Sequence, residues 1–195
     1  MISIAITGGI GSGKSYVSAL LEKREIPIYN ADNESKRLTV SDMEIKRGLV
    51  DLLGEDIYKE GKLNKPMLAS YLFASSENAS RINAIIHPRV KNDFLRWKNE
   101  HEDYEIVGLE SAILYESGFD DVVDVVVMVY APENLRLERA MKRDSATEEQ
   151  IRMRMAAQMD ENDKRDKADF VVINDGTIPL EKQLDNLIEC LKKGN

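Results

Sequence analysis

The sequence predicts an α/β fold in which helices flank a parallel sheet. Short apolar runs alternate along the chain with segments whose apolar residues recur at helical spacing. A glycine-rich loop directly follows the first apolar run, and 195 residues suit one large domain or a core with a modest insert. The expected strands are Ile2–Thr7, Ile26–Tyr29, Glu105–Leu109, Val122–Tyr130 and Phe170–Ile173, of which Val122–Tyr130 is the clearest.

The loop Gly8–Ser15 fits the pattern G-x-x-x-x-G-K-[ST] of a phosphate-binding loop. An apolar run precedes it and a helical pattern starts near Lys14, which is the strand–loop–helix context that the motif requires. Glycines let backbone N–H groups approach phosphate oxygens, and the helix N-terminus adds a positive dipole. We expect Lys14 to reach the β- and γ-phosphates of a nucleotide and the Ser15 hydroxyl to hold Mg²⁺. The alternative interpretation is a glycine-rich turn without a ligand.

Two stretches depart from the alternating pattern. Residues from about 42 to 100 have helical spacing and no convincing strand, which predicts a helical insert between two strands of the core. Such an insert either carries an acceptor substrate or serves only for packing. The stretch Pro132–Lys167 is helical and highly charged, and its basic residues are Arg136, Arg139, Lys142, Arg143, Arg152, Arg154, Lys164, Arg165 and Lys167.

Composition excludes several classes of protein. The net charge of −8 argues against nucleic acid as a main partner, so a nucleotide enzyme of this charge must concentrate positive charge locally. No apolar stretch approaches the roughly 20 residues that span a bilayer, and because the sequence opens on an expected core strand, no signal peptide is expected. The single cysteine, Cys190, suits a reducing cytoplasm and is expected to be a half-buried residue of the last helix. The His and Cys content offers no zinc site.

Two carboxylates follow predicted strands. Asp32 comes after the second strand, where the ends of parallel strands face a ligand crevice, so it could accept a proton from an acceptor hydroxyl. It could equally be the N-cap of the next helix. Glu110 comes after the third strand, where an acid commonly holds Mg²⁺ beside a phosphate loop. The alternative for Glu110 is a solvated acid at a strand end.

Three arginines and a histidine are further candidates. Arg139 and Arg143 are four residues apart and share a helix face, and Arg154 lies in the same charged stretch. Arginine binds phosphate through two parallel hydrogen bonds, although pairing with nearby glutamates would explain these residues as well. His87 precedes Pro88, which predicts a helix start or break there. A lone histidine is more often structural than catalytic. His101 lies in a polar stretch and is expected to be solvated.

Several segments together resemble the dephospho-CoA kinase family almost from end to end. The resemblance rests on six segments: Ile6–Ser15, Asn30–Asp32, His87–Pro88, Ala112–Gly118, Arg154–Met159 and Ala168–Asn174. The first matches the family's phosphate loop, including its Thr-Gly-Gly-Ile start. The Arg-x-Ala-Ala-Gln segment and the Ala-Asp-x-Val-x-x-Asn strand are much more specific than the loop, which many families share.

The resemblance implies a reaction and a fold. ATP would phosphorylate the ribose 3′-hydroxyl of dephospho-CoA, giving CoA and ADP in the final step of CoA biosynthesis. The implied architecture is a three-layer P-loop NTPase fold, with a nucleotide-binding core at about 1–40, 104–135 and 168–195, a helical CoA-binding insert at about 41–103 and a lid at about 136–167. The implied cofactor is Mg²⁺, and the implied partners are ATP and dephospho-CoA, with neither nucleic acid nor membrane. A cytoplasmic monomer or weak homo-oligomer is expected.

The resemblance also assigns residues. The expected catalytic residues are Asp32 as base, Lys14, Arg139 and Arg143. The expected ATP contacts are Gly9, Gly11, Ser12, Gly13, Lys14, Ser15, Tyr16, Arg143 and Asn174. Asp32, His87 and Arg154 are expected at the acceptor substrate, and Ser15 and Glu110 at the metal.

The chain departs from the family pattern at three positions. Tyr16 replaces the usual Thr, Asn30 replaces the first Asp of Asp-Ala-Asp, and Glu110 stands where Asp is commoner. Because of Asn30, only Asp32 can be the base in that segment. A kinase for another small hydroxyl or nucleotide acceptor remains an alternative. A GTPase-type switch is a weaker one, because its Asn-Lys-x-Asp motif has no counterpart: Asn64 and Lys65 lack the following acid.

Overall fold

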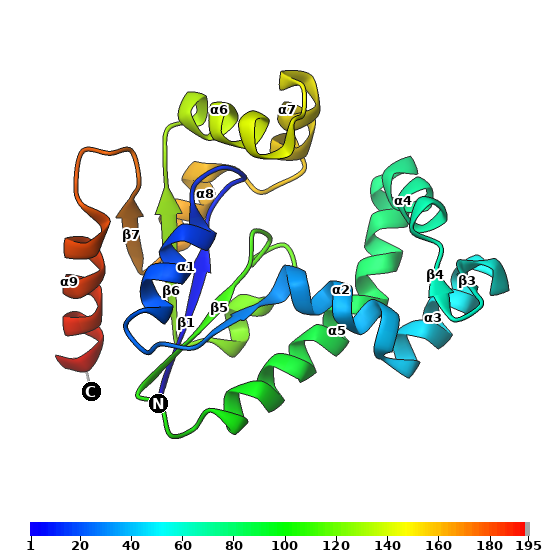
Figure 1. The fold of residues 1–195 in the computed structure, drawn as a ribbon, viewed down its shortest axis with the longest axis horizontal. Coiled ribbons are helices and arrows are strands. Elements are labelled where there is room, and N and C mark those ends of the chain that lie inside the picture. The colour runs from blue at the N-terminus through cyan, green and yellow to red at the C-terminus, as the bar shows by residue number, and fades with distance from the viewer. Residues whose placement is uncertain (194–195) are drawn as a thin grey trace. The chain divides into compact units, whose positions relative to one another are not determined.

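Five parallel strands form the main sheet in the described residues, which are 1–193 of this computed structural model. The strands are β1 (Ile2–Thr7), β2 (Ile28–Asn30), β5 (Ile106–Glu110), β6 (Val125–Tyr130) and β7 (Phe170–Ile173). Their spatial order is β2-β5-β1-β6-β7, and every neighbouring pair is parallel (Figure 1). The predicted α/β fold with a parallel sheet is confirmed.

The predicted strand Val122–Tyr130 was too long at its start. Residues Phe119–Val122 form a 3-10 turn, and β6 begins only at Val125. Between them, the Asp124 carboxylate accepts hydrogen bonds from the N–H and the hydroxyl of Ser3 at 2.7 and 2.6 Å. Together with the Asp124 N–H, which donates to the Ser3 carbonyl oxygen at 2.8 Å, this bonding ties the entry of β6 to β1, which the apolar pattern alone does not reveal.

The strands β2 and β5 are both shifted from their predicted positions. Ile26 is not part of β2, because its N–H donates to the carbonyl oxygen of Leu21 at 3.2 Å and closes the end of the preceding helix. Glu110 does not follow β5 but is its last residue, in register with Ile6 of β1 and Asn30 of β2. The acid is therefore held by the sheet itself.

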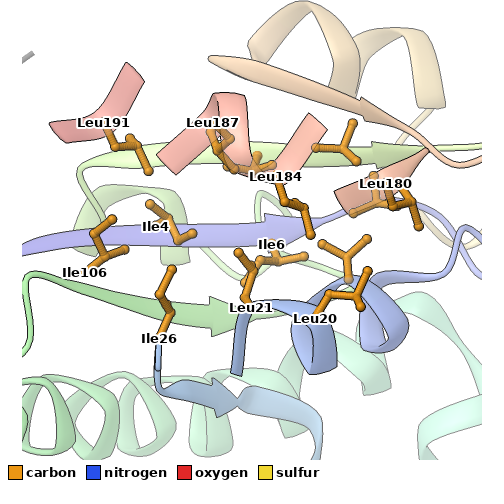
Figure 2. Packing of buried hydrophobic residues seen from close by; sticks show 14 residues of the cluster. Ile4, Ile6, Leu20, Leu21, Ile26, Ile106, Leu180, Leu184, Leu187 and Leu191 are labelled. Atoms are coloured by element: carbon orange, nitrogen blue, oxygen red, sulfur yellow. The ribbon is translucent and has the colours of Figure 1, made fainter. Parts of the chain in front are cut away.

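Helices cover the sheet. Helices α1 (Lys14–Glu22), α8 (Glu161–Lys167) and α9 (Leu180–Lys193) contact its strands, whereas α6 (Glu133–Asp144) and α7 (Glu148–Ala156) pack against each other. Ile4 and Ile6 of β1 pack with Leu21 of α1 and with Leu184 and other leucines of α9 in one buried cluster (Figure 2). Burial of such side chains stabilises the fold by about 1.5–3 kcal/mol each. This cluster fixes α1, and with it the end of the glycine-rich loop, against β1.

The opposite face of the sheet is covered as well. Side chains alternate along a strand, so Ala5 and Leu109 point away from the cluster that contains Ile4 and Ile106. Ala5, Leu109 and Met128 are nevertheless completely buried. Helix α8 packs against β6. Both faces of the sheet are therefore buried from solvent, as is usual for a parallel sheet.

A second compact unit, Ala31–Trp97, interrupts the sheet unit, which contains Met1–Asn30 and the chain from Lys98 onward. Its bounds lie earlier at both ends than the predicted insert of about 41–103. Its elements are α2 (Ala31–Ser41), α3 (Met43–Leu53), a 3-10 turn (Glu55–Ile57), β3 (Tyr58–Lys59), β4 (Lys62–Leu63), α4 (Lys65–Ala74) and most of α5 (Ser76–Glu100).

The expectation that this segment has no strand was wrong. Strands β3 and β4 pair as an antiparallel hairpin around Glu60 and Gly61, which both have positive φ. Two residues per strand are too few to show an alternating pattern, so the hairpin has no apolar signal in the sequence.

The expected helix start or break at Pro88 was also wrong. Helix α5 runs through Pro88 without interruption. Ile86, Val90 and Phe94 are buried along one face of this helix. Packing of that face outweighs the hydrogen bond that a proline removes.

Two observations concern the surface. Cys190 is exposed on α9, contrary to the expected half-buried position, because the buried stripe of this helix runs through Leu184, Leu187 and Leu191 instead. In the described part of the chain, no helix combines the length and the apolar character needed to cross a membrane.

Candidate functional site

The glycine-rich loop Gly8–Ser15 connects β1 to α1, as the motif predicts. Gly13 precedes α1 with φ 96°, a left-handed conformation that residues with a Cβ rarely adopt. No side chain caps this helix end, which favours an anion there, although the Tyr16 N–H already donates to the Gly13 carbonyl oxygen at 3.0 Å. Gly11 also has a positive φ, 81°. The loop therefore has the backbone geometry of an anion-binding cradle.

Lys14 lies across the loop. Its Nζ donates hydrogen bonds to the carbonyl oxygens of Gly8 and Gly9 at 2.8 and 3.1 Å. The N–H of Ser12 donates to the Gly9 carbonyl oxygen at 3.1 Å and closes the turn. The ammonium group is thus held at the cradle, where a phosphate would meet it.

Ser15 and Glu110 come together from α1 and β5. The Ser15 hydroxyl donates a hydrogen bond to Oε1 of Glu110 at 2.7 Å, and Glu110 is only 7% exposed. A hydroxyl and a carboxylate are oxygen ligands that suit Mg²⁺, which usually takes its remaining ligands from substrate phosphates and water. In residues 1–193, no group of three or more His, Cys, Asp or Glu side chains could hold a metal ion by itself. The pair therefore fits a magnesium ion that arrives with a nucleotide.

Asn174 links the loop to α6. Its Nδ2 donates to the Ser12 carbonyl oxygen at 2.8 Å, and its backbone carbonyl oxygen accepts from Nη1 of Arg139 at 2.9 Å. A Cβ on Gly13 would collide with the Asn174 amide. The structure thus brings Arg139 and Asn174, two predicted site residues, to the same side of the loop.

Arg143 of α6 and Arg154 of α7 share one carboxylate partner. Both guanidinium groups bond Asp144: Nε of Arg143 lies 2.7 Å from Oδ1, and Nη1 of Arg154 lies 2.6 Å from Oδ2. The two arginines lower the pKa of Asp144 far below its usual value. Asp144 gathers these two cations on α6 and α7, and sequence reasoning had not singled it out.

A second residue that sequence reasoning missed is Gln158. Its Oε1 accepts from the N–H of Ile10 in the loop at 3.0 Å, and its Nε2 donates to the Ala112 carbonyl oxygen at 3.1 Å. The Arg-x-Ala-Ala-Gln segment, which supports the family resemblance, contains Gln158. Only its arginine, Arg154, was predicted as a site residue. Gln158 connects the segment between α7 and α8 to both the phosphate loop and the segment after β5.

Asp32, His87 and Tyr16 lie on three different helices. Asp32 is exposed in the first turn of α2, which already begins at Ala31, so Asp32 is not the N-cap that the alternative interpretation required. His87 is partly buried on α5, and burial lowers its pKa, so the imidazole is neutral at pH 7. Tyr16 is 57% exposed in the first turn of α1.

Known proteins resemble this chain over nearly its whole length. The family model described as dephospho-CoA kinase matches residues 2–179. A dephospho-CoA kinase from Bacteroides fragilis (strain YCH46) is 55% identical over 190 residues, which cover 97% of this chain and 93% of that protein. The crystal structure of TT1252 from Thermus thermophilus has a TM-score of 0.81 at 32% identity and covers 98% of this chain and 97% of its own. A dephospho-CoA kinase from Campylobacter jejuni shares the fold with a TM-score of 0.69 at 24% identity, covering 99% and 98%.

Proposed function

The chain belongs to the dephospho-CoA kinase family, and from this premise we propose how its residues divide the work of the reaction. In that reaction, ATP phosphorylates the ribose 3′-hydroxyl of dephospho-CoA and yields CoA and ADP. The observation that carries the proposal is the convergence of Lys14, Ser15 and Glu110 at one loop. Phosphoryl transfer needs a phosphate cradle, a metal and cations, and little covalent chemistry from the protein.

The phosphate loop binds ATP. Backbone N–H groups of the loop bind the phosphates, although those of Ile10 and Ser12 must first give up their bonds to Gln158 and to the Gly9 carbonyl oxygen. Lys14 exchanges its bonds to the loop carbonyls for the β- and γ-phosphates. Its charge then balances the charge that spreads over the phosphoryl oxygens during transfer. Asn174 and Tyr16 form walls of the nucleotide site beside the loop.

Ser15 and Glu110 hold Mg²⁺. When bound, this ion neutralises the triphosphate and stabilises its developing charge. The Glu110 carboxylate is fixed by its place at the end of β5, and the Ser15 hydroxyl already points to it. Both groups therefore need little reorganisation to become ligands.

Asp32 is the general base. Its exposed carboxylate at the start of α2 accepts the proton of the attacking ribose hydroxyl. Because α2 already begins at Ala31, Asp32 is not its N-cap, and this supports the role as a base. Such a group contributes roughly 10²–10⁴-fold to the rate.

The arginines and the helical unit act on the substrates. Arg139 and Arg143 neutralise the phosphates, while Arg154 and His87 bind the acceptor. The helical insert, about 41–103, binds CoA, and residues of about 136–167 form a lid that excludes water during transfer. We further propose that the protein is a cytoplasmic monomer or weak homo-oligomer.

The test is ADP release by the purified protein with Mg-ATP, with and without dephospho-CoA, and identification of the product by mass spectrometry. We expect ADP formation that depends on dephospho-CoA and a product with the mass of CoA. Lys14→Ala is the control, because it removes the phosphate contact but no acceptor contact. Turnover only with another hydroxyl acceptor, such as a nucleoside monophosphate, would support a kinase activity but refute dephospho-CoA as its substrate.

A further inference from the structure

Two charged side chains that have no role above lie directly against the phosphate loop. Arg136 of α6 is only 6% exposed, and its Nε donates to the Ala131 carbonyl oxygen at 3.0 Å. Its Nη1 lies 3.7 Å from Oε1 of Glu161, the first residue of α8. A Cβ on Gly9 would collide with both of these atoms. The guanidinium and the carboxylate therefore meet at the first turn of the cradle.

The Glu161 carboxylate is in an unfavourable environment for an anion. Its Oε2 is buried and, within the described part of the chain, has no hydrogen-bond partner. Burial raises its pKa, against the opposing effect of Arg136, Lys164 and Lys14. Of these cations, Lys164 is engaged elsewhere, with Nζ 3.0 Å from the Ala112 carbonyl oxygen and 3.2 Å from Glu116. Glu161 also accepts a hydrogen bond from the Gly9 N–H of the loop, so Arg136, Lys14 and the loop backbone together offset its charge.

The backbone of Glu161 is held in this position. Lys164, one turn further along α8, is completely buried, and Asp160 caps the helix by accepting from the Asn162 N–H at 2.8 Å. Beside the carboxylate lies an open groove of about 410 Å³. Its polar lining includes Glu133, Arg136, Arg152, Gln158 and Glu161. The groove gives a solvated ligand access to the Arg136–Glu161 pair.

We propose that Glu161 is an internal competitor of the triphosphate. Its carboxylate interacts with the positive charges of Arg136 and Lys14 at the loop. On ATP binding, Arg136 turns from Glu161 to the phosphates. Glu161 thereby weakens ATP binding and sets the affinity, while Arg136 is a further phosphate-contacting cation. This inference rests on the proposed role of the loop as the ATP cradle.

The test measures nucleotide affinity by isothermal titration calorimetry for wild type and Glu161→Gln. The ligands are the non-hydrolysable β,γ-imido analogue of ATP with Mg²⁺, ADP with Mg²⁺, and adenosine. Removing a negative charge beside the phosphates is expected to tighten binding of the triphosphate about tenfold, of ADP less, and of adenosine not at all. This dependence on phosphate number would not arise from a merely structural role.

Glu133→Gln is the matched control, because Glu133 lines the same groove but is exposed and pairs with Arg152 at 2.7 Å. We expect less than a twofold change from it. Arg136→Gln should weaken triphosphate binding, and in that background Glu161→Gln should have a much smaller effect. Circular dichroism and thermal unfolding verify that each variant is folded, and Glu161→Asp keeps the charge if Gln disturbs α8.

Unchanged or weaker triphosphate binding by folded Glu161→Gln would overturn the proposal, because the carboxylate would then support the loop instead of competing with the ligand. Failure of the cradle assignment gives a different result. In that case wild type itself would not bind the triphosphate more tightly than adenosine, and Lys14→Ala would bind it equally well.

Discussion

Glu116→Gln should destabilise the sheet unit through a residue on another element, Lys164. The ammonium of Lys164 is completely buried, and Glu116 is its only carboxylate partner among the described ion pairs, at 3.2 Å. At this separation and an effective dielectric of about 20, the Coulomb attraction is about 5 kcal/mol. The Glu116 side chain is 24% exposed, so solvent reduces the net loss to about 2 kcal/mol. The melting temperature should fall by roughly 4–8 °C.

Urea unfolding followed by circular dichroism measures this loss. Because the cost comes from an unpaired buried charge, Lys164→Met in the Glu116→Gln background should recover at least half of the lost stability. Glu148→Gln is the control, since Glu148 pairs with Arg152 at the surface and should change stability by less than about 0.5 kcal/mol. Stability within about 0.3 kcal/mol of wild type for Glu116→Gln, or a double variant no more stable than it, would refute the reasoning.

Three further predictions concern the proposed chemistry and one buried phenol. Asp32→Asn should keep ATP binding and lose roughly 10²-fold or more in turnover, measured as ADP release at saturating substrates; near-normal turnover would remove Asp32 as the base. Lys14→Ala should lose most activity and ATP affinity, because the loop loses its cation, and retention of both would contradict the cradle. Burial raises the pKa of Tyr115 to about 12. Since an unfolded tyrosine ionises near pH 10, its contribution to stability is complete below about pH 10 and is lost as the pH rises toward 12. Tyr115→Phe should therefore show a shallower decline of unfolding free energy between about pH 10 and 12, and equal slopes would argue against the shift.

The Glu116–Lys164 pair also bears on the site. Lys164 and Gln158 both donate to the Ala112 carbonyl oxygen, and Gln158 accepts from the loop residue Ile10. Glu116 additionally accepts from the Met159 N–H at 2.7 Å. The segment after β5, the start of α8 and the phosphate loop are thus joined by a few hydrogen bonds. Loss of the Glu116 charge can therefore affect the phosphate loop through these hydrogen bonds.

The sequence by itself determined the features that depend on neighbouring residues. Apolar runs placed the parallel strands to within a few residues, and the glycine spacing identified the loop between β1 and α1. It also indicated that Ser15 and Glu110 belong to one site, because parallel strands end at a common edge. The family resemblance added the reaction and the acceptor.

Only the tertiary structure decided which charges meet. Nothing in the local pattern shows that Arg143 and Arg154 share Asp144, or that Arg136 and Glu161 lie against Gly9. Likewise, burial of one face carried α5 through Pro88, against the local preference of proline. Periodicity reports which face of an element is apolar, whereas the partner of a charged side chain depends on how distant elements pack. The strands and the loop could therefore be predicted, and the ion pairs around the loop could not.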